Sequence, residues 1–379
     1  HYMTAYVTLG ENAVADGCFP HRTEDYIVLK SLADDYYLDM VYYYLGCLLY
    51  DRRAYGEAIA DYEEAALRYP DFPTVHRNLA LAYYNVKKQP QRAYEEMEKA
   101  FALDETDARV YLELDQLKKR LNVPVKERWS DMEKHFDLVE SRDDLYLEYV
   151  TLLNTLGESE KALNLIKARK FHQWEGGEGK VAAQYLTALY QLAKAAAAEG
   201  EYVEAKTILL QAVDEYPQNL GEGKLESAQE NNLHYLLGLV REKLGETEEA
   251  FASLTKACHG ESEPVGMMYY NDQPPEMIYY QGLAYRKLGN EEQAVRRFRK
   301  LVEYGREHIE ENVKIDYFAV SLPDLLIFEE NLDERNRKHC LFMMSLGLKG
   351  LGRSDEAEKC AEELLAMDNA HQGIRVHDL

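Results

Sequence analysis

A helix–turn–helix pattern of about 34 residues recurs along this chain, and it constrains the fold more than any other feature. In the copy from Asp39 to Pro70, apolar residues recur at helical spacing on two successive segments. The small residues Gly46 and Ala58 lie where the two predicted helices must approach each other. Because one short pair cannot bury both of its faces, neighbouring pairs have to stack. The pattern therefore predicts an all-α protein, with helix–turn–helix repeats stacked into a right-handed superhelical solenoid.

Seven further copies of this pattern follow, of which four are clear, two are weak and one is degenerate. They contain Leu79, Tyr111, Tyr146, Leu189, His234, Ile278 and Met344. A glycine is expected after the first helix in five units, because glycine adopts a left-handed conformation at no steric cost. These glycines are Gly157, Gly200, Gly245, Gly289 and Gly352. About eight units cover most of the chain.

The alternation of small and aromatic residues in these units, as at Gly46, Ala58 and Tyr62, resembles the tetratricopeptide repeat. The resemblance implies a concave inner groove that is lined by the first helix of each unit. An aromatic lining suits an extended peptide or a sugar, since tyrosine offers a flat apolar face and a hydroxyl. The alternative is that many of these tyrosines pack between units. The predicted lining includes Tyr43, Tyr50, Asn78, Tyr84, Tyr190, Lys194, Tyr235, Tyr279 and Arg286.

One mode of peptide binding is disfavoured by charge. Chaperone-binding members of the repeat family clamp a C-terminal carboxylate with lysine, asparagine and arginine at set inner positions. Only Asn78 matches that arrangement in the first three units, and Glu113 would repel the carboxylate. We therefore do not expect a carboxylate clamp of that kind here.

Three connections between helices are longer than helix pairs require, and they carry polar and aromatic residues that suit binding. Gly-Glu-Gly-Lys occurs at 177–180 and again at 221–224, without the spacing or the preceding strand of a phosphate loop. Either both loops contact a ligand at one end of the groove, or glycine simply allows the turn into the next helix. Trp174 either plugs a gap between units or stacks on a ligand. The candidate binding residues are His172, Trp174, Glu178, Lys180, Asn219, Glu222, Lys224, Asn271 and Asp272.

These connections carry a second, more specific resemblance. The strings FHQWEGGEGK, NLGEGKL, YYNDQPPEMIYYQGLAY and IDYFAVSLPDLLIF resemble the C-terminal repeat region of a bacterial family of large multidomain proteins. The amino-terminal part of those proteins is a β-rich domain of carbohydrate-enzyme character, and they often occur beside sugar-utilisation genes. The resemblance covers residues 165–379 and implies that this chain is the helical tail of a larger protein. It carries over no catalytic role.

The sequence predicts five segments. Residues 1–38 form an N-terminal segment that contacts a missing upstream domain. Residues 39–170 hold repeats with a degenerate third unit, and residues 171–304 hold repeats with long polar inserts. Residues 305–340 form an inserted helical pair, or alternatively a docking surface for a second chain. Residues 341–379 form the last repeat and a tail.

Composition excludes several classes of function. With 44 basic against 68 acidic residues the net charge is −24, which argues against nucleic-acid binding. No apolar run approaches the roughly 18 residues that span a bilayer. The five cysteines are widely spaced and lack a C-x-x-C pair, so we expect reduced thiols in a cytoplasm. No cysteine or histidine cluster has metal-ligand spacing, and we expect neither metal nor cofactor.

No catalytic motif stands out in the sequence. G-x-S-x-G and H-E-x-x-H are missing, and a carboxylate pair for glycoside hydrolysis cannot be chosen among 68 acidic residues. We therefore expect a non-catalytic scaffold for protein–protein or interdomain contacts, with self-association as one form of contact. Two alternatives stay open. One is an independent peptide-binding adaptor, and the other is a module whose inserts complete the active site of an upstream glycan-processing domain.

Overall fold

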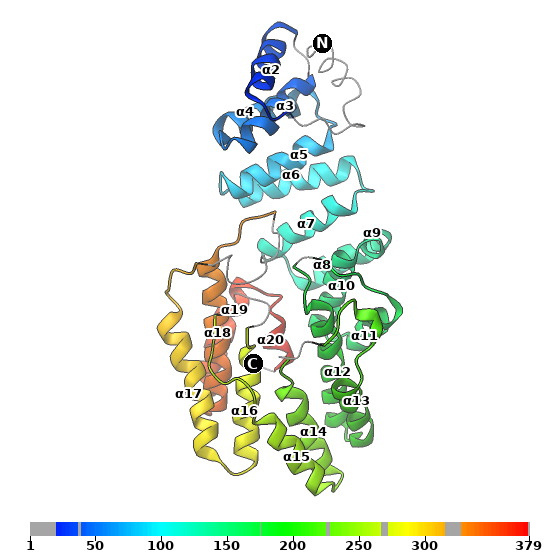
Figure 1. The fold of residues 1–379 in the computed structure, drawn as a ribbon, viewed down its shortest axis with the longest axis vertical. Helices are drawn as coiled ribbons and strands as arrows, with labels where there is room; N and C mark the ends of the chain where they lie inside the picture. The colour runs from blue at the N-terminus through cyan, green and yellow to red at the C-terminus, as the bar shows by residue number, and fades with distance from the viewer. Residues whose placement is uncertain are drawn as a thin grey trace. The chain divides into compact units, whose positions relative to one another are not determined.

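The computed structural model describes residues 20–36, 39–174, 176–224, 228–266, 272–314 and 327–377. Throughout these ranges the regular structure is helical, without a β-strand, which confirms the all-α prediction. The helices form two compact units (Figure 1). The first unit contains residues up to Leu121 together with Ile327–Glu329, and the second contains the rest of the described chain.

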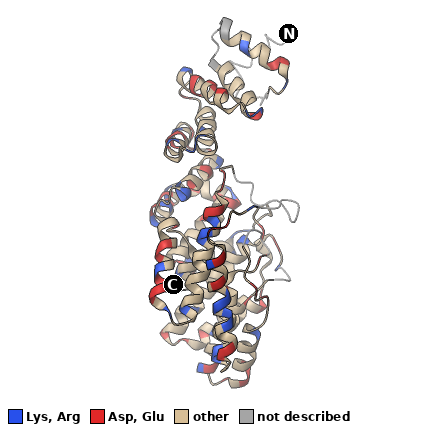
Figure 2. Ribbon diagram, turned by 90° about the vertical axis from the view of Figure 1, so that its left-hand side faces the viewer, with Lys and Arg blue, Asp and Glu red and all other residues tan. Residues whose placement is uncertain are grey.

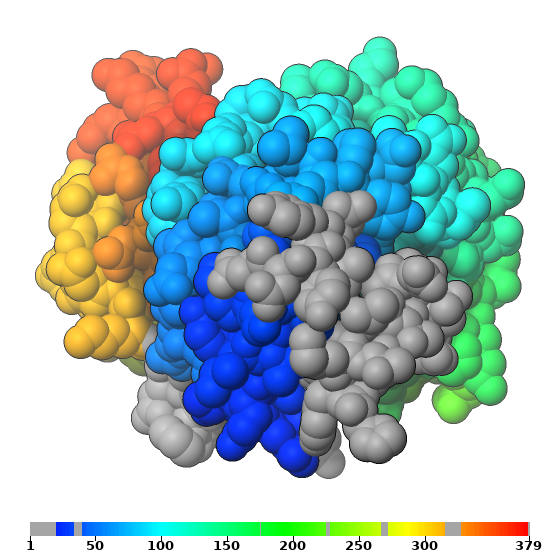
Figure 3. Space-filling model, turned by 90° about the horizontal axis from the view of Figure 1, so that it is seen from above, coloured from blue at the N-terminus to red at the C-terminus, as the bar shows by residue number. Residues whose placement is uncertain are grey.

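The first unit is a stack of short helices in chain order. Seen from above, they follow one another from blue to cyan (Figure 3). Helix α2 packs on α3 through the buried side chains of Leu29 and Leu32. The predicted contact of residues 1–38 with an upstream domain stays a prediction, and residues 1–19 lie outside the described ranges. The helices are α2 (Thr23–Tyr36), α3 (Asp39–Asp51), α4 (Tyr55–Arg68), α5 (Pro73–Asn85), α6 (Pro90–Leu103) and α7 (Ala108–Arg120).

The second unit continues the pattern of paired helices and ends in a short helix, α20. Acidic and basic residues are interleaved along its helices (Figure 2). No helix in the described part of the chain is long and apolar enough to cross a membrane. The early helices are α8 (Val125–Lys134), α9 (Phe136–Ser141), α10 (Asp143–Leu156), α11 (Ser159–Ala168), α12 (Lys180–Glu199), α13 (Tyr202–Asp214) and the 3-10 turn η1 (Gln218–Leu220). The later ones are α14 (Asn231–Lys243), α15 (Thr247–Ala257), α16 (Pro275–Lys287), α17 (Glu291–His308), α18 (Leu332–Gly350), α19 (Ser354–Met367) and α20 (Gln372–Val376).

In three helix pairs, a glycine on the first helix lies opposite a large residue sixteen positions later on the second. A Cβ atom built on Gly46 would lie 2.5 Å from Cδ1 of Tyr62, and one built on Gly282 would lie 2.5 Å from Cε1 of Phe298. Such distances are too short for any real side chain, so the glycine is required by the packing. Gly238 meets Leu254 in the same way.

The turns between paired helices use left-handed glycines, as the sequence predicts. Gly157 and Gly200 have φ angles of 85° and 88°, which residues with a Cβ rarely adopt. The amide of Gly157 donates to the carbonyl oxygen of Asn154, and this bond satisfies one of the last carbonyl groups of α10.

The predicted helical pair at 305–340 falls partly on residues 315–326, which lie outside the described ranges. The described parts are the end of α17 and the beginning of α18. Helix α18 packs on both α17 and α19, and Cys340, Met343 and Leu346 are fully buried. It therefore serves as the first helix of the last pair.

Candidate functional site

A non-helical segment of the chain, Ile327–Glu329, is bound against α5 and α7 of the first unit. The side-chain amide of Asn85 contacts the backbone on both sides of Phe328. Its Nδ2 donates to the carbonyl oxygen of Ile327 at 2.7 Å, and its Oδ1 accepts from the amide of Glu329 at 2.8 Å. One asparagine at the end of α5 thus satisfies two backbone groups that have no helical partner.

The ring of Phe328 is fully buried at the same place. It meets the ring of Tyr84 edge-on, with the centroids 5.1 Å apart. Nη2 of Arg120, at the end of α7, donates to the carbonyl oxygen of Phe328 at 3.0 Å. Lys88 pairs with Glu329 at 2.6 Å, but both side chains are well exposed, so this pair contributes little. We call the site formed by Tyr84, Asn85 and Arg120 the phenylalanine slot.

Two of the four residues predicted to line this part of the groove belong to the slot or its border. Tyr84 contacts Phe328 directly. Tyr50 lies beside the slot: burial raises the pKa of its hydroxyl, while a hydrogen bond with Asn85 lowers it. Tyr43 lies elsewhere, packed edge-on against Phe72 in the core, as the packing alternative expects. The fourth residue, Asn78, lies beside Arg77 and Cys47.

Two arginines of the first unit are paired with the buried Glu113. Its buried carboxylate accepts two hydrogen bonds from Arg77, at 2.5 and 2.6 Å, and one from Arg109 at 3.1 Å. Asn78 accepts from Arg77 and donates to the sulfur of Cys47. The two arginines near Asn78 are therefore already neutralised by an internal carboxylate. A carboxylate clamp would require an incoming acid to displace Glu113.

In the second unit, two of the three long connections meet. The amide of Phe171 donates to the carbonyl oxygen of Asn219 at 2.9 Å, and the amide of Gly179 donates to Oε2 of Glu222 at 3.0 Å. Between them lies a cavity of about 380 Å³. Its lining is His172, Gln173, Trp174, Gly177, Glu178, Val181, Leu220, Gly221 and Glu222. The sequence interpretation named four of these residues.

Most of the named residues in these two connections have an internal partner. The exposed His172 donates its amide to Asp143 at 2.9 Å, and its Nδ1 lies 3.0 Å from the same carboxylate. Burial raises the pKa of Asp143, but the hydrogen bonds from His172 and Arg169 outweigh burial and hold the pKa below its usual value. The side chain of Asn219 donates to two carbonyl groups at the end of α11 and so holds the loop in place.

Trp174 and parts of the two Gly-Glu-Gly-Lys loops make local contacts. The indole of Trp174 lies directly on Gly177, leaving no room there for a Cβ atom. Glu178 and Lys180 are exposed, and Lys224 forms an ion pair with Glu230. Glu222 is the exception, because its Oε1 is buried and has no hydrogen-bond partner among the described residues.

The third long connection is not brought into that cavity by any described residue. Asn271 lies outside the described ranges. Asp272 is half-buried, and the adjacent Gln273 donates to the carbonyl oxygen of Glu261. Of the three long connections, two therefore lie together, at 171–179 and 219–222, and the described residues of the third do not join them.

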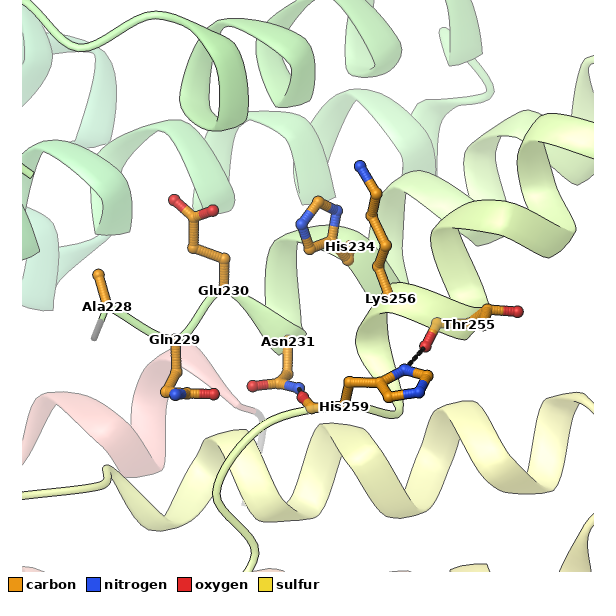
Figure 4. A pocket seen from close by; sticks show the side chains of 8 residues that line it. All are labelled: Ala228, Gln229, Glu230, Asn231, His234, Thr255, Lys256 and His259. Atoms are coloured by element: carbon orange, nitrogen blue, oxygen red, sulfur yellow. Dashed lines mark hydrogen bonds between the residues drawn. The ribbon is translucent and has the colours of Figure 1, made fainter. Parts of the chain in front are cut away.

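A larger cavity of about 510 Å³ lies where the chain enters α14, and sequence reasoning did not identify it. Glu230, His234 and Lys256 project to one side of it (Figure 4). Burial, together with the nearby charge of Lys256, lowers the pKa of His234 to about 4, so the ring is neutral at pH 7. Asn231 donates to the carbonyl groups of Ala257 and His259 and ties α14 to the end of α15. No group of three metal-ligating side chains occurs here or elsewhere in the described chain.

The other predicted groove residues of the second unit lie between helices. Tyr279 is buried against Phe298, and Tyr235 is half-buried beside the ring of Tyr280. Arg286 pairs with Glu291 at 2.6 Å, and it donates to the carbonyl oxygen of Gly350 at 2.7 Å. These three positions join neighbouring helices, and their predicted binding roles stay predictions.

Comparison with known proteins identifies the repeats. Family models described as tetratricopeptide repeat match residues 43–108, 187–219, 232–258 and 276–304. Among the 141 solved chains that match is a structure of Naa15/Naa10 bound to HypK-THB, with 12% identity and a TM-score of 0.42. The match covers 93% of this chain and 57% of the Naa15/Naa10 structure's matched chain. A crystal structure of MamA matches with 15% identity and a TM-score of 0.20, over 70% of this chain and 98% of that one. The matched segments coincide with the paired helices, and the chain therefore carries tetratricopeptide repeats.

Proposed function

We propose that this protein is a non-catalytic scaffold that holds short peptide segments of partner proteins on the inner faces of its repeats. The observation that carries the proposal is the phenylalanine slot, where Ile327–Glu329 is bound by a side-chain amide and an aromatic ring. The presence of tetratricopeptide repeats supports a role in protein–protein interaction.

The chemistry of the slot suits recognition of a peptide rather than catalysis. The Asn85 amide has both a donor and an acceptor, so it brackets one residue of any sequence through its backbone. Specificity comes from the ring that fills the space beside Tyr84, because burying an aromatic side chain removes a large apolar area from water. Together they select a short segment with one central aromatic residue.

The test uses the full chain with Phe328→Ala, which removes the aromatic ring from the slot and weakens its occupation in cis, and a labelled peptide of residues 324–332. We expect the peptide to bind this chain saturably in fluorescence anisotropy, whereas the same peptide lacking the phenylalanine ring does not bind. Adding Asn85→Ala removes two hydrogen bonds worth about 0.5–1.5 kcal/mol each, which predicts affinity lower by roughly 5- to 150-fold. The matched control is Lys87→Ala, an exposed change on the same turn. Equal affinity with and without Asn85 refutes the proposal.

A finer version of this function concerns the parent protein. The resemblance of the long connections to a carbohydrate-related bacterial family suggests that this chain serves an upstream domain, in a cytoplasm and with self-association as a further contact. The cavity between the 171–179 and 219–222 loops supports a ligand or domain contact there, since Glu222 keeps an unpaired buried oxygen. Alanine at Glu178 or Glu222 in the full reading frame should then lower sugar turnover without lowering stability. An unchanged turnover contradicts that version.

A further inference from the structure

The last described residues of the chain lie on the face of the second unit that is formed by first helices. Residues 371–377, which include α20, contact α10, α12, α16 and α18, and these are the first members of four helix pairs. Figure 1 shows α20 in the middle of this unit, with α16 and α18 on one side and α12 on the other. This is the surface on which repeats of this kind are expected to bind peptides.

The backbone of this segment is held by charged side chains from two helices. Nζ of Lys194 in α12 donates to the carbonyl oxygen of Val376 at 3.0 Å. Nζ of Lys349 in α18 donates to the carbonyl oxygen of His377 at 3.4 Å. Hydrogen bonds from charged donors are stronger than those from neutral ones. The last described carbonyl groups of the chain are therefore bound from opposite sides of the unit.

The side chains of the segment are matched to the same surface. Nδ1 of His377 lies 2.9 Å from the hydroxyl of Tyr280, which in turn lies 2.7 Å from the hydroxyl of Tyr190. All three residues are buried. Gln372 donates to Oε1 of Gln184 at 3.1 Å. His377 thus completes a buried chain of hydrogen bonds with Tyr280 and Tyr190, while Gln372 makes a separate, half-buried contact with Gln184.

The shape of this surface further restricts which side chains the bound segment can carry. Ile374 and Val376 are only 2% and 7% exposed. A Cβ atom on Gly373 would lie 2.5 Å from Cζ of Phe342 in α18, so only glycine allows the backbone this close. Arg375, by contrast, is exposed, and among the described residues its side chain bonds to the carbonyl oxygen of Asn369 within the tail. The pattern Gln-Gly-aliphatic-x-aliphatic-His is therefore the sequence pattern that we expect of a peptide bound at this surface.

We infer that the inner face of the second unit is a peptide-binding site that residues 371–377 occupy in cis, and that they compete there with a partner peptide of the same pattern. The inference rests on the proposed function, because it takes the repeats to be peptide-binding elements. A short tether gives the segment an effective concentration in the millimolar range. A partner peptide must therefore bind tightly or be presented together with a second contact, such as one at the phenylalanine slot.

The test compares full chains that differ at one tail residue. Gly373→Leu drives a side chain into Phe342 and should release the tail, whereas Arg375→Ala is the matched control that leaves it bound. A labelled peptide of residues 366–379 should bind the Gly373→Leu chain saturably, and bind the wild-type and Arg375→Ala chains at least tenfold more weakly. Tyr280→Phe in the Gly373→Leu chain should weaken the peptide further.

Hydrogen–deuterium exchange at Ile374 and Val376 provides the second readout. We expect rapid exchange in the Gly373→Leu chain and slow exchange in the Arg375→Ala chain. Slow exchange in both, or no peptide binding to the released chain, overturns the inference. A concentration-dependent dimer that Gly373→Leu abolishes would show that copies exchange tails, and it would equally overturn occupation in cis. If the 324–332 peptide still binds the Phe328→Ala chain in these cases, the proposed function survives and only this inference fails.

Discussion

Replacing Gly282 by alanine tests whether close helix packing, rather than helix propensity, determines the residue at this position. The ring of Phe298 is fully buried and lies between Gly282 of α16 and Gly350 of α18, neither of which leaves room for a Cβ atom. Tyr279 and Arg286 lie on its other sides. The ring centroid of Tyr279 is 5.7 Å and Cζ of Arg286 is 5.0 Å from the centroid of the Phe298 ring. The ring therefore has nowhere to move when a methyl group is added.

The expected magnitude follows from two opposing terms. Alanine gains about 1 kcal/mol over glycine inside a helix. Overpacking costs about 1–3 kcal/mol, and the upper end applies because Phe298 is blocked on both sides. We therefore expect Gly282→Ala to lower the free energy of unfolding by about 2 kcal/mol. The matched control is Gly56→Ala in α4, where no atom lies within 4 Å of an added Cβ; it should raise the free energy of unfolding by about 0.5–1 kcal/mol.

Urea unfolding followed by circular dichroism measures both changes, provided that the denaturant dependence stays the same. Adding Phe298→Leu to Gly282→Ala should return part of the loss, with a coupling energy of about 1 kcal/mol or more between the two sites. If Gly282→Ala is as stable as the Gly56→Ala control, steric contact does not explain this position and the reasoning is wrong.

Two further predictions concern buried charges in the first unit. Glu113→Ala should lower the free energy of unfolding by about 3 kcal/mol, because it leaves Arg77 without its carboxylate in a mostly buried position; urea unfolding measures this, and a loss below about 0.5 kcal/mol contradicts it. His76 presents Nδ1 to Glu96 at 2.6 Å and Nε2 to the carbonyl oxygen of Pro70 at 2.8 Å, and the bond to Glu96 raises the pKa of His76. The protonated ring therefore stabilises the fold fully below about pH 6.5, and this stabilisation is lost as the pH rises through the higher pKa of the folded state. Comparing the wild-type chain with Glu96→Gln across that range should show a difference in stability that shrinks with rising pH, and a difference independent of pH would contradict the assignment.

The paired helices could be predicted because each contact that specifies them is local. Gly46 and Tyr62 lie sixteen residues apart within one repeat, so periodicity alone places them opposite each other. The left-handed turn at Gly157 is likewise a property of a few neighbouring residues. Such short-range patterns are visible in a single sequence.

The roles of individual groove residues were not visible in the same way. Tyr43 and Tyr84 both lie on first helices, yet one ring is buried among core aromatic residues and the other meets Phe328. Helical spacing assigns a residue to a face of its own helix, but the neighbouring elements decide whether that face is covered.

What the sequence alone determined is the type of repeat, its approximate number and the turns between its helices. Only the tertiary structure decided what lies on the inner faces. Ile327 contacts Asn85 across 242 residues of chain, and Val376 contacts Lys194 across 182. Both bound segments are too short for their own sequence pattern to indicate which surface they contact. Contacts between such distant residues are set by the packing of the whole chain, since no local pattern encodes which surface a segment will reach.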